Sequence, residues 1–265
     1  MRLSCPEQML AEYPSEERLR IIRDSGFDGV DCRYASLEDP AFLEPLHDSG
    51  LPLASVYSQI RTPSLLDHEA SDRASAVDEV VRRARTAARH GATNLILVPV
   101  FGETRLSLDL SESEIVDVET ALLIVSLKEI SDRLGEASVT VVVEPLNRNE
   151  THFLTNPAIA AGICGKVNSP RIATMVDTYH CHQEHLDSPE QIDRVGDHLA
   201  LVHLSDSGRG LPGEGEVDFQ AVLVALAAAG YSGWLGFECR QVTTTDDERA
   251  LAASVETMRS MSVPA

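Results

Sequence analysis

The stretch VVVEPLNRNETHFLTN (residues 141–156) contains a strand signal, a polar loop and the start of a helix. The residues from Thr140 to Val143 favour a buried β-strand, because branched side chains pack well on a pleated surface. The strand signal ends at Glu144, and Pro145 follows it. A lone carboxylate at the end of a buried strand costs free energy unless another group pairs with it. The fold therefore has to supply a partner for Glu144.

A strand signal followed by a helical pattern recurs along the whole chain. Continuous apolar runs predict strands that are covered on both faces, as in parallel sheets. The predicted strands are Leu3–Ser4, Gly29–Asp31, Leu53–Tyr57, Asn94–Val98, Thr140–Glu144, Ile172–Asp177, Leu199–Leu204 and Trp234–Glu238. A glycine after a helical pattern is typical of a helix end. The predicted helix ends are Gly26, Gly50, Gly91, Gly135, Gly165, Gly196 and Gly230.

Several helix starts are also signalled. Asn156-Pro157 fits an N-cap followed by proline at the first helical position. Ser188-Pro189 fits the same pattern, with Gln191 completing a capping box, and Asp218 is a further candidate cap. The longest predicted helices cover residues 72–90 and 114–134.

Eight alternations of strand and helix in 265 residues predict an α/β fold of the (β/α)8 TIM barrel type. We expect one domain over residues 1–265, because no linker or change in composition divides the chain. A doubly wound open sheet is the alternative. A nucleotide-binding version of that sheet lacks support, since no glycine-rich phosphate-binding motif follows a predicted strand.

The composition limits the partners and the compartment. The formal net charge is −20, from 42 acidic and 22 basic residues, and such a surface repels nucleic acid and anionic membranes. The sequence has neither a signal-peptide pattern at its start nor an apolar run of the ~20 residues that span a membrane. The five cysteines are scattered, odd in number and free of CxxC spacing, which favours free thiols in the cytoplasm.

Four consecutive predicted strands carry polar residues at or near their ends. They are Glu144, Asp177, His203 and Glu238, on the fifth to eighth strands. In a barrel these positions lie side by side on the carboxyl-terminal face, where barrel active sites are found. Three converging carboxylates repel one another unless a cation lies between them. Oxygen ligands with one imidazole favour Mn²⁺ or Mg²⁺, with Co²⁺ or Zn²⁺ as further candidates.

These motifs carry a family resemblance. The chain resembles the sugar isomerase/epimerase superfamily, the xylose isomerase-like barrels, and within it the metal-dependent ketose 3-epimerases of the D-tagatose and D-psicose group. The matching stretches are EPLNRNE (144–150), DTYH (177–180), HLSDSGRGLPGEG (203–215) and GWLGFE (233–238).

The resemblance implies a role for each matching residue. Glu144, Asp177, His203 and Glu238 would bind one divalent metal ion, most readily Mn²⁺, and Glu144 and Glu238 would also act as the acid/base pair. Glu150 and His180 would bind the O1/O2 end of a ketose, and Arg209 a neighbouring oxygen. The partner would be a small-molecule sugar, with no nucleic acid and no membrane, and the protein would form a homo-oligomer, a dimer or a tetramer.

The implied activity is epimerisation of a ketose through a metal-bound cis-enediolate, with one glutamate on each face of the reacting carbon. The same groups suit a 1,2-isomerisation. A metal-dependent dehydratase acting on a cyclic polyol ketone, such as inosose or 3-dehydroshikimate, is the alternative, and a barrel without catalytic activity is a third. The net charge of −20 argues against the abasic-site endonucleases, which share this barrel.

Other polar residues leave two interpretations open. His182 and His185 are either solvated loop residues or determinants of substrate choice. Arg240 binds either an anionic group of the substrate or a structural ion-pair partner. Asp206 is a candidate hydrogen-bond partner of a metal ligand. Tyr13 and Tyr57 are candidates to cover one face of a sugar, and the acidic residues after GRGLPG favour a substrate without phosphate.

Overall fold

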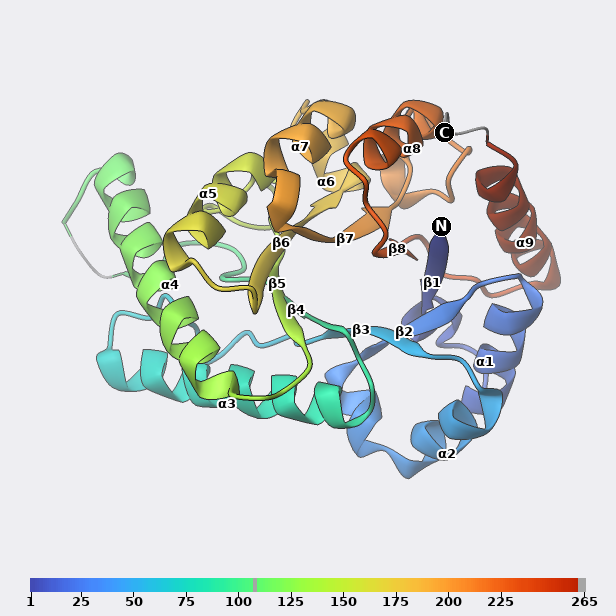
Figure 1. Cartoon of the computed structure of the whole chain (residues 1–265), viewed down its shortest axis with the longest axis horizontal. Coiled ribbons are helices and arrows are strands. Elements are labelled where there is room, and N and C mark those ends of the chain that lie inside the picture. The colour runs from blue at the N-terminus through green and yellow to red at the C-terminus, as the bar shows by residue number, and fades with distance from the viewer. Residues whose placement is uncertain (107–108, 262–265) are drawn as a thin grey trace.

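The computed structural model describes residues 1–106 and 109–261, and within them eight parallel strands close into a barrel in chain order. The last strand pairs with the first through Trp234 and Arg2. Figure 1 shows the strands in the centre, with the helices around them. The strands are β1 (Arg2–Pro6), β2 (Gly29–Arg33), β3 (Leu53–Tyr57), β4 (Asn94–Leu97), β5 (Thr140–Val143), β6 (Ile172–Asp177), β7 (Leu199–Leu204) and β8 (Trp234–Phe237). All eight predicted strands are confirmed, and β3, β6 and β7 have the predicted bounds.

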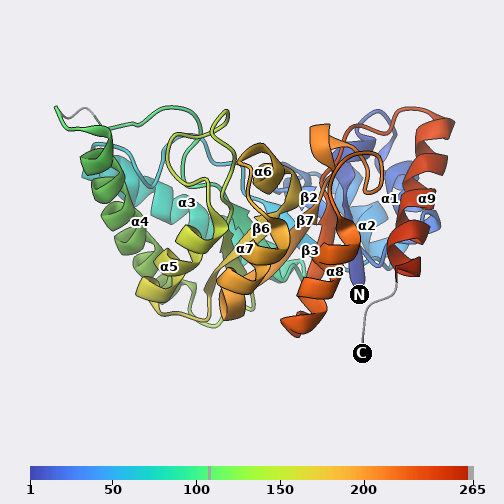
Figure 2. The same cartoon turned by 90° about the horizontal axis from the view of Figure 1, so that it is seen from above.

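Helices cover the outside of the barrel, as Figure 2 shows from a second direction. They are α1 (Ser15–Asp24), α2 (Pro40–Ser49), α3 (Ala70–Arg89), α4 (Glu112–Leu134), α5 (Pro157–Val167), α6 (Thr178–Gln183), α7 (Ser188–Val195), α8 (Phe219–Ala228) and α9 (Thr245–Ser260). Short 3-10 turns also occur, among them η1 (Glu7–Leu10) and η4 (Ser207–Arg209). The (β/α)8 fold predicted from the sequence is confirmed, whereas its organisation as one domain stays a prediction.

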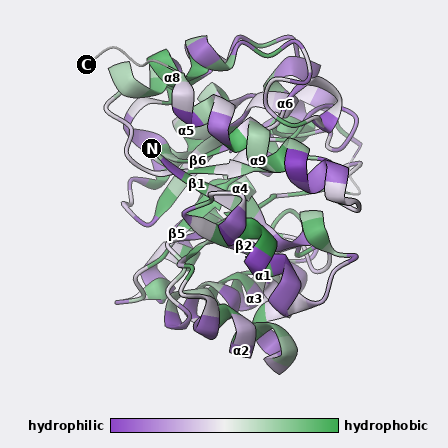
Figure 3. Cartoon of the chain, turned by 90° about the vertical axis from the view of Figure 1, so that its right-hand side faces the viewer, coloured by the Kyte–Doolittle hydropathy of each residue, from purple (hydrophilic) through white to green (hydrophobic). Residues whose placement is uncertain are grey.

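The core has two parts, as expected of a barrel whose strands are covered on both sides. Apolar side chains between the strands and the helices form the larger part, and the helices carry both hydrophilic and hydrophobic residues (Figure 3). A smaller cluster fills the inside of the barrel. Its members are Ala54, Tyr57, Ile96, Val142, Met175, Leu201 and Trp234. The barrel is therefore a packed interior rather than a pore.

Two predicted helix caps are confirmed and two predicted helix boundaries are wrong. Asn156 and Asp218 cap α5 and α8 by accepting backbone N–H groups. The cap of α7 is Asp187 rather than Ser188, because the Asp187 carboxylate reaches the N–H of Glu190. Helix α5 continues past Gly165 and ends at Asn168, whose φ of 54° places it in the left-handed region. Asparagine tolerates that region better than most residues do.

Two further features of the described chain concern its helices and its cysteines. None of its helices is both long enough and apolar enough to cross a membrane. The five cysteines all lie within the described residues and are free thiols.

A candidate metal centre and its cavity

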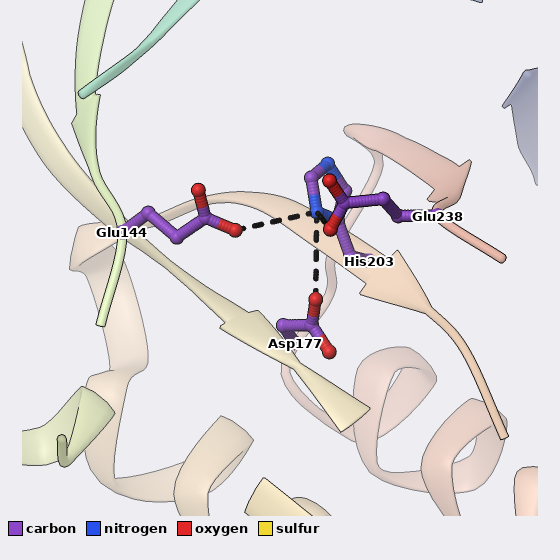
Figure 4. A group of neighbouring side chains, drawn as sticks. All are labelled: Glu144, Asp177, His203 and Glu238. Atoms are coloured by element: carbon purple, nitrogen blue, oxygen red, sulfur yellow. Dashed lines mark ion pairs between the residues drawn. The ribbon is translucent and has the colours of Figure 1, made fainter. Parts of the chain in front are cut away.

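Four side chains converge at the carboxyl ends of β5 to β8 (Figure 4). Glu144 and Glu238 directly follow β5 and β8, Asp177 ends β6, and His203 lies in β7 as the register partner of Asp177. One potential ligand atom from each of the four lies within 4.8 Å of the other three. His203 Nδ1 is 3.6 Å from Glu144 Oε1, 3.7 Å from Asp177 Oδ2 and 3.3 Å from Glu238 Oε2. The structure thus brings together the whole ligand set predicted from the sequence.

The imidazole of His203 fits a metal ligand. It is fully buried, and neither of its nitrogens has a hydrogen-bond partner in the described part of the chain. A buried polar group without a partner is costly, so such atoms are rare unless they bind something. Ligand atoms held about 2.1 Å from one ion lie roughly 3.0–3.4 Å apart, close to the spacing around Nδ1. The four residues could therefore hold one divalent cation.

Arg209 supplies a positive charge beside the carboxylates. Its guanidinium donates hydrogen bonds to Glu238 Oε2 at 2.8 Å and to Asp177 Oδ2 at 3.1 Å. It also stacks over the ring of Tyr179 at 4.2 Å. The three carboxylates of the ligand set would be neutralised together by Arg209 and one divalent ion, so the charges of the site favour a cation of that valence.

The carboxylates have unequal proton affinities. Burial raises the pKa of Glu144, and the attraction of His203 only partly opposes this. Burial acts in the same direction on Asp177, but the charge of Arg209 with His180 and His203 outweighs it and holds the pKa well below its usual range. The pKa of Glu238 is also lowered, because His203 and Arg209 outweigh its burial. Two carboxylates with opposite shifts are typical of acid/base pairs.

A cavity of about 330 Å³ opens beside the ligand set. Its lining includes Glu144 and Glu238 as well as all three residues to which the resemblance gives a role in substrate binding, Glu150, His180 and Arg209. The other lining residues are Tyr57, Ser58, Gln59, Ile60, Arg61, Ile96, Val98, Phe101 and Leu146. Tyr57, one of the two candidates to cover a sugar, is thus at the cavity, whereas Tyr13 is not among its lining residues and donates a hydrogen bond to Glu248.

Asn147 holds two of these residues in place, a role that the sequence did not reveal. Its backbone N–H donates to His180 Nδ1 at 3.0 Å, and its side-chain amide donates to Glu150 Oε1 at 2.9 Å. On the other side of the ring, Arg209 Nη2 contacts His180 Nε2 at 3.0 Å. His180 is therefore held between Asn147 and Arg209 beside the cavity.

The loop that carries Arg209 is fixed by Asp206, which corrects its predicted role. The buried Asp206 carboxylate accepts backbone N–H groups of Gly213, Gly215 and Val217 at 2.8–3.0 Å, rather than contacting a metal ligand. Arg209 itself has a φ of 62°, a conformation that costs free energy and is often found at functional sites. Asp206 thus orders the loop that presents Arg209.

Replacing Asp206 by alanine is expected to destabilise the protein and to weaken ligand binding together. The substitution leaves three partly buried N–H groups without their acceptor, at about 3 kcal/mol of unfolding free energy in total. Urea unfolding measures this loss, and the KM for substrate should rise because Arg209 is no longer held. The control is Asp246→Ala, which removes an exposed carboxylate paired with Arg249 and should change stability by less than about 0.5 kcal/mol. Equal stability of the two variants would contradict the assignment.

The remaining candidates lie away from the cavity. His182 and His185 are not among its lining residues, and His182 Nε2 is 3.8 Å from a carboxylate oxygen of Glu216. Arg240 makes ion pairs with Glu214 at 2.9 Å and with Asp247 at 2.8 Å. The structural interpretation of Arg240 is therefore the one that the contacts support.

The sequence over residues 19–261 matches the model of the family described as xylose isomerase-like TIM barrel. The chain belongs to this family. Because the match covers nearly all of the chain, the fold and the family predicted from the motifs are both confirmed.

Similar proteins within this barrel family include sugar epimerases. A ketose 3-epimerase of Arthrobacter globiformis is 34% identical over 109 residues, which are 41% of this chain and only 38% of that protein. An L-ribulose 3-epimerase of Mesorhizobium japonicum is 27% identical over 233 residues, covering 86% of this chain and 76% of that protein. The crystal structure of an Escherichia coli 3-keto-D-glucoside 4-epimerase superimposes with a TM-score of 0.81 at 24% identity, covering 98% of this chain and 99% of that one.

Proposed function

We propose that this protein is a divalent-metal-dependent epimerase of a ketose-type sugar, and that it inverts the hydroxyl-bearing carbon next to the carbonyl. The observation that carries the proposal is the placement of two of the four candidate ligands, the carboxylates of Glu144 and Glu238, on either side of His203. Figure 4 shows Glu144 and Glu238 approaching His203 from opposite sides. Inversion at carbon needs a proton carrier on each face, and this arrangement supplies two.

Each residue has a distinct task in this proposal. A divalent ion held by Glu144, Asp177, His203 and Glu238 would act as a Lewis acid that makes the C–H beside the carbonyl more acidic. One glutamate then removes that proton and leaves its electron pair in the enediolate of the substrate. The other glutamate delivers a proton to the opposite face, so the product differs only in configuration. Reversal of the two roles carries the reaction in the other direction.

The other cavity residues orient the sugar. His180 and Arg209 lie side by side in the cavity lining, with 3.0 Å between Nε2 and Nη2, and would bind neighbouring oxygens of the substrate. Glu150, held by Asn147, offers a carboxylate that accepts a hydroxyl proton. The names of the relatives support the same reaction class, because a 3-epimerase of L-ribulose and a 4-epimerase of a 3-keto-glucoside both invert a carbon adjacent to a carbonyl.

The proposal is tested by isotope exchange. The protein is incubated in D₂O with Mn²⁺, Mg²⁺ or Co²⁺ and a panel of ketoses that includes L-ribulose, D-psicose and D-tagatose, and NMR follows each carbon. We expect deuterium at C3 together with the C3 epimer, in the presence of metal only. Exchange confined to C1 would instead indicate a 1,2-isomerase. Loss of water from a cyclic polyol ketone such as inosose would indicate the dehydratase, and an inert protein would overturn the proposal.

Three finer assignments accompany the proposal. Mn²⁺ is the preferred ion, because carboxylates dominate the ligand set. The protein works in the cytoplasm, where its free thiols stay reduced. It forms a homo-oligomer, a dimer or a tetramer, which sedimentation equilibrium measures directly.

A further inference from the structure

A small polar group lies inside the barrel, close to His203. Its members are Ser4 on β1, Asp31 on β2 and Ser55 on β3, and each has 0% of its surface exposed. None of the three is among the residues that line the cavity. A fully buried carboxylate that cannot touch a substrate needs another explanation, because burying such a group is costly.

The hydrogen bonds of this group are incomplete. Ser55 donates to Asp31 Oδ1 at 2.6 Å, which satisfies one oxygen of the carboxylate. Three buried atoms nearby have no hydrogen-bond partner in the described ranges 1–106 and 109–261. They are Ser4 Oγ, Asp31 Oδ2 and His203 Nε2.

The side chains of Asp31, Ser4 and His203 all come close to one point, in front of Gly236 on β8. A Cβ atom built on Gly236 would lie 3.2 Å from Asp31 Oδ2, 3.2 Å from His203 Cδ2 and 3.3 Å from Ser4 Oγ. The sheet register explains the convergence, because Gly236 pairs with Ser4 on one side and with His203 on the other. Any other residue at this position would press its Cβ atom against all three side chains.

We propose that Asp31 is a positioning residue for the metal-binding histidine, reaching His203 Nε2–H through a water molecule that Ser4 also holds. A buried water needs two to four polar partners, and the three groups supply them. With its proton held on Nε2, His203 directs the lone pair of Nδ1 towards Glu144, Asp177 and Glu238. Metal-binding histidines commonly donate their second N–H to a carboxylate in this way. The inference rests on the metal centre of the proposed function.

The environment of Asp31 agrees with this role. Burial raises its pKa, while Ser55, Ser4 and the charge of His203 act in the opposite direction. Asp31 approaches the Cδ2 edge of the imidazole, whereas the three ligand carboxylates lie at Nδ1. A purely structural Asp31 would affect folding, whereas a positioning Asp31 affects the metal and the histidine proton. These effects can be measured separately.

The experiment compares Asp31→Asn, Gly236→Ala and Ser4→Ala with the unaltered protein. Calorimetry gives the Kd of Zn²⁺ and Mn²⁺, and ¹H–¹⁵N NMR of the Zn²⁺ form reports the protonated nitrogen of His203. Asp31→Asn should weaken metal binding by about 10- to 100-fold and shift the Nε2–H signal or expose it to exchange. Gly236→Ala should weaken binding as well, because its methyl group fills the point where the three groups meet. Ser4→Ala, which leaves the carboxylate in place, should have the smallest effect.

The control is Glu119→Gln. Glu119 is a second carboxylate with 0% exposure, and it contacts a different histidine, His152, with 2.7 Å between Oε2 and Nε2. This variant should leave the metal Kd unchanged within twofold. Folding of each metal-free variant is checked by circular dichroism. If Asp31→Asn does not fold, Gly236→Ala and Ser4→Ala decide the outcome with the same two readouts.

The outcomes separate the two proposals. A wild-type protein that binds no divalent metal overturns the metal centre itself. A wild-type protein that binds metal, alongside folded variants with unchanged Kd and an unchanged His203 signal, overturns the role of Asp31 alone.

Discussion

Replacing Glu238 by glutamine is expected to reduce epimerisation by about 10³-fold, since general acid/base groups typically contribute 10²- to 10⁴-fold. The amide keeps the size of the side chain but can neither accept nor deliver the proton. Because the pKa of Glu238 is lowered, this side chain is ionised near neutral pH and ready to act as a base. Glu144→Gln is expected to have an effect of similar size.

The two variants should differ in which epimer still exchanges hydrogen. Each keeps one glutamate, which can still remove a proton from the face that it covers. In D₂O, each variant is therefore expected to exchange the C3 hydrogen of one epimer slowly, with little inversion, and the two variants should prefer opposite epimers. NMR with both epimers as starting material measures this directly.

The control for these variants is Glu214→Gln. Glu214 also holds the loop of Arg209, so a second control, Glu129→Gln, removes an exposed carboxylate that pairs with Arg133 outside the cavity lining and should leave turnover within twofold. Metal content is measured in every sample and the ion is supplied in excess, because Glu144 and Glu238 also belong to the ligand set. Exchange of both epimers at the wild-type rate in either variant would contradict the two-base assignment.

Removing the divalent ion is expected to abolish activity and to lower the free energy of unfolding. An ion present at one hundred times its Kd stabilises the fold by about 2.7 kcal/mol, and a chelator removes this contribution. Without the ion, the three ligand carboxylates are balanced only by Arg209 and a protonated His203. Thermal melting with EDTA, and again after adding back metal, measures the difference. A melting temperature indifferent to both treatments would contradict the assignment.

Metal binding should also depend on pH in a defined direction. Burial would lower the pKa of His203, but the carboxylates of Asp177, Glu144 and Glu238 raise it well above 6.5 in the metal-free fold. The contribution of this proton to the free energy of unfolding of the metal-free protein is fully present below pH 6.5. It disappears as the pH rises through the raised pKa. The ion must displace the proton, so its affinity should rise about tenfold per pH unit above 6.5, up to the raised pKa.

Calorimetry at pH 7 in buffers of different ionisation enthalpy tests this directly. We expect about one proton released per bound ion, because a ligand must lose its proton before it can bind metal. A result of no proton released at pH 7 would show that His203 is already neutral in the metal-free protein.

The ligand set could be predicted from the sequence because it depends on short-range signals. Each of Glu144, Asp177 and Glu238 comes at the end of an apolar run, and His203 lies near the end of another. In parallel strands, the carboxyl ends share one face regardless of how far apart they are in the chain. Order along the chain therefore sufficed to bring the four residues together.

Other parts of the site could not be predicted because they depend on register and on loop paths. Asp31 approaches His203 only because β8 closes the barrel against β1, a pairing that no local pattern encodes. Asp206 was a candidate hydrogen-bond partner of a metal ligand, yet its oxygens accept backbone N–H groups of its own loop. Asn147 acts through a backbone N–H as well as its side chain, and its residue type alone does not indicate this.

Part of the cavity lining comes from residues 57–101, before the strands that carry the candidate metal ligands. The candidate ligands and the three substrate-binding candidates all lie between Glu144 and Glu238, whereas the other lining residues include residues 57–61, Ile96, Val98 and Phe101. Part of the cavity lining is thus distant in sequence from the residues proposed to carry out the reaction. Exchanging residues 58–61 for those of a relative should alter the choice of sugar and leave the proton-transfer apparatus intact, so new specificities could be obtained on this scaffold by replacing a single short loop.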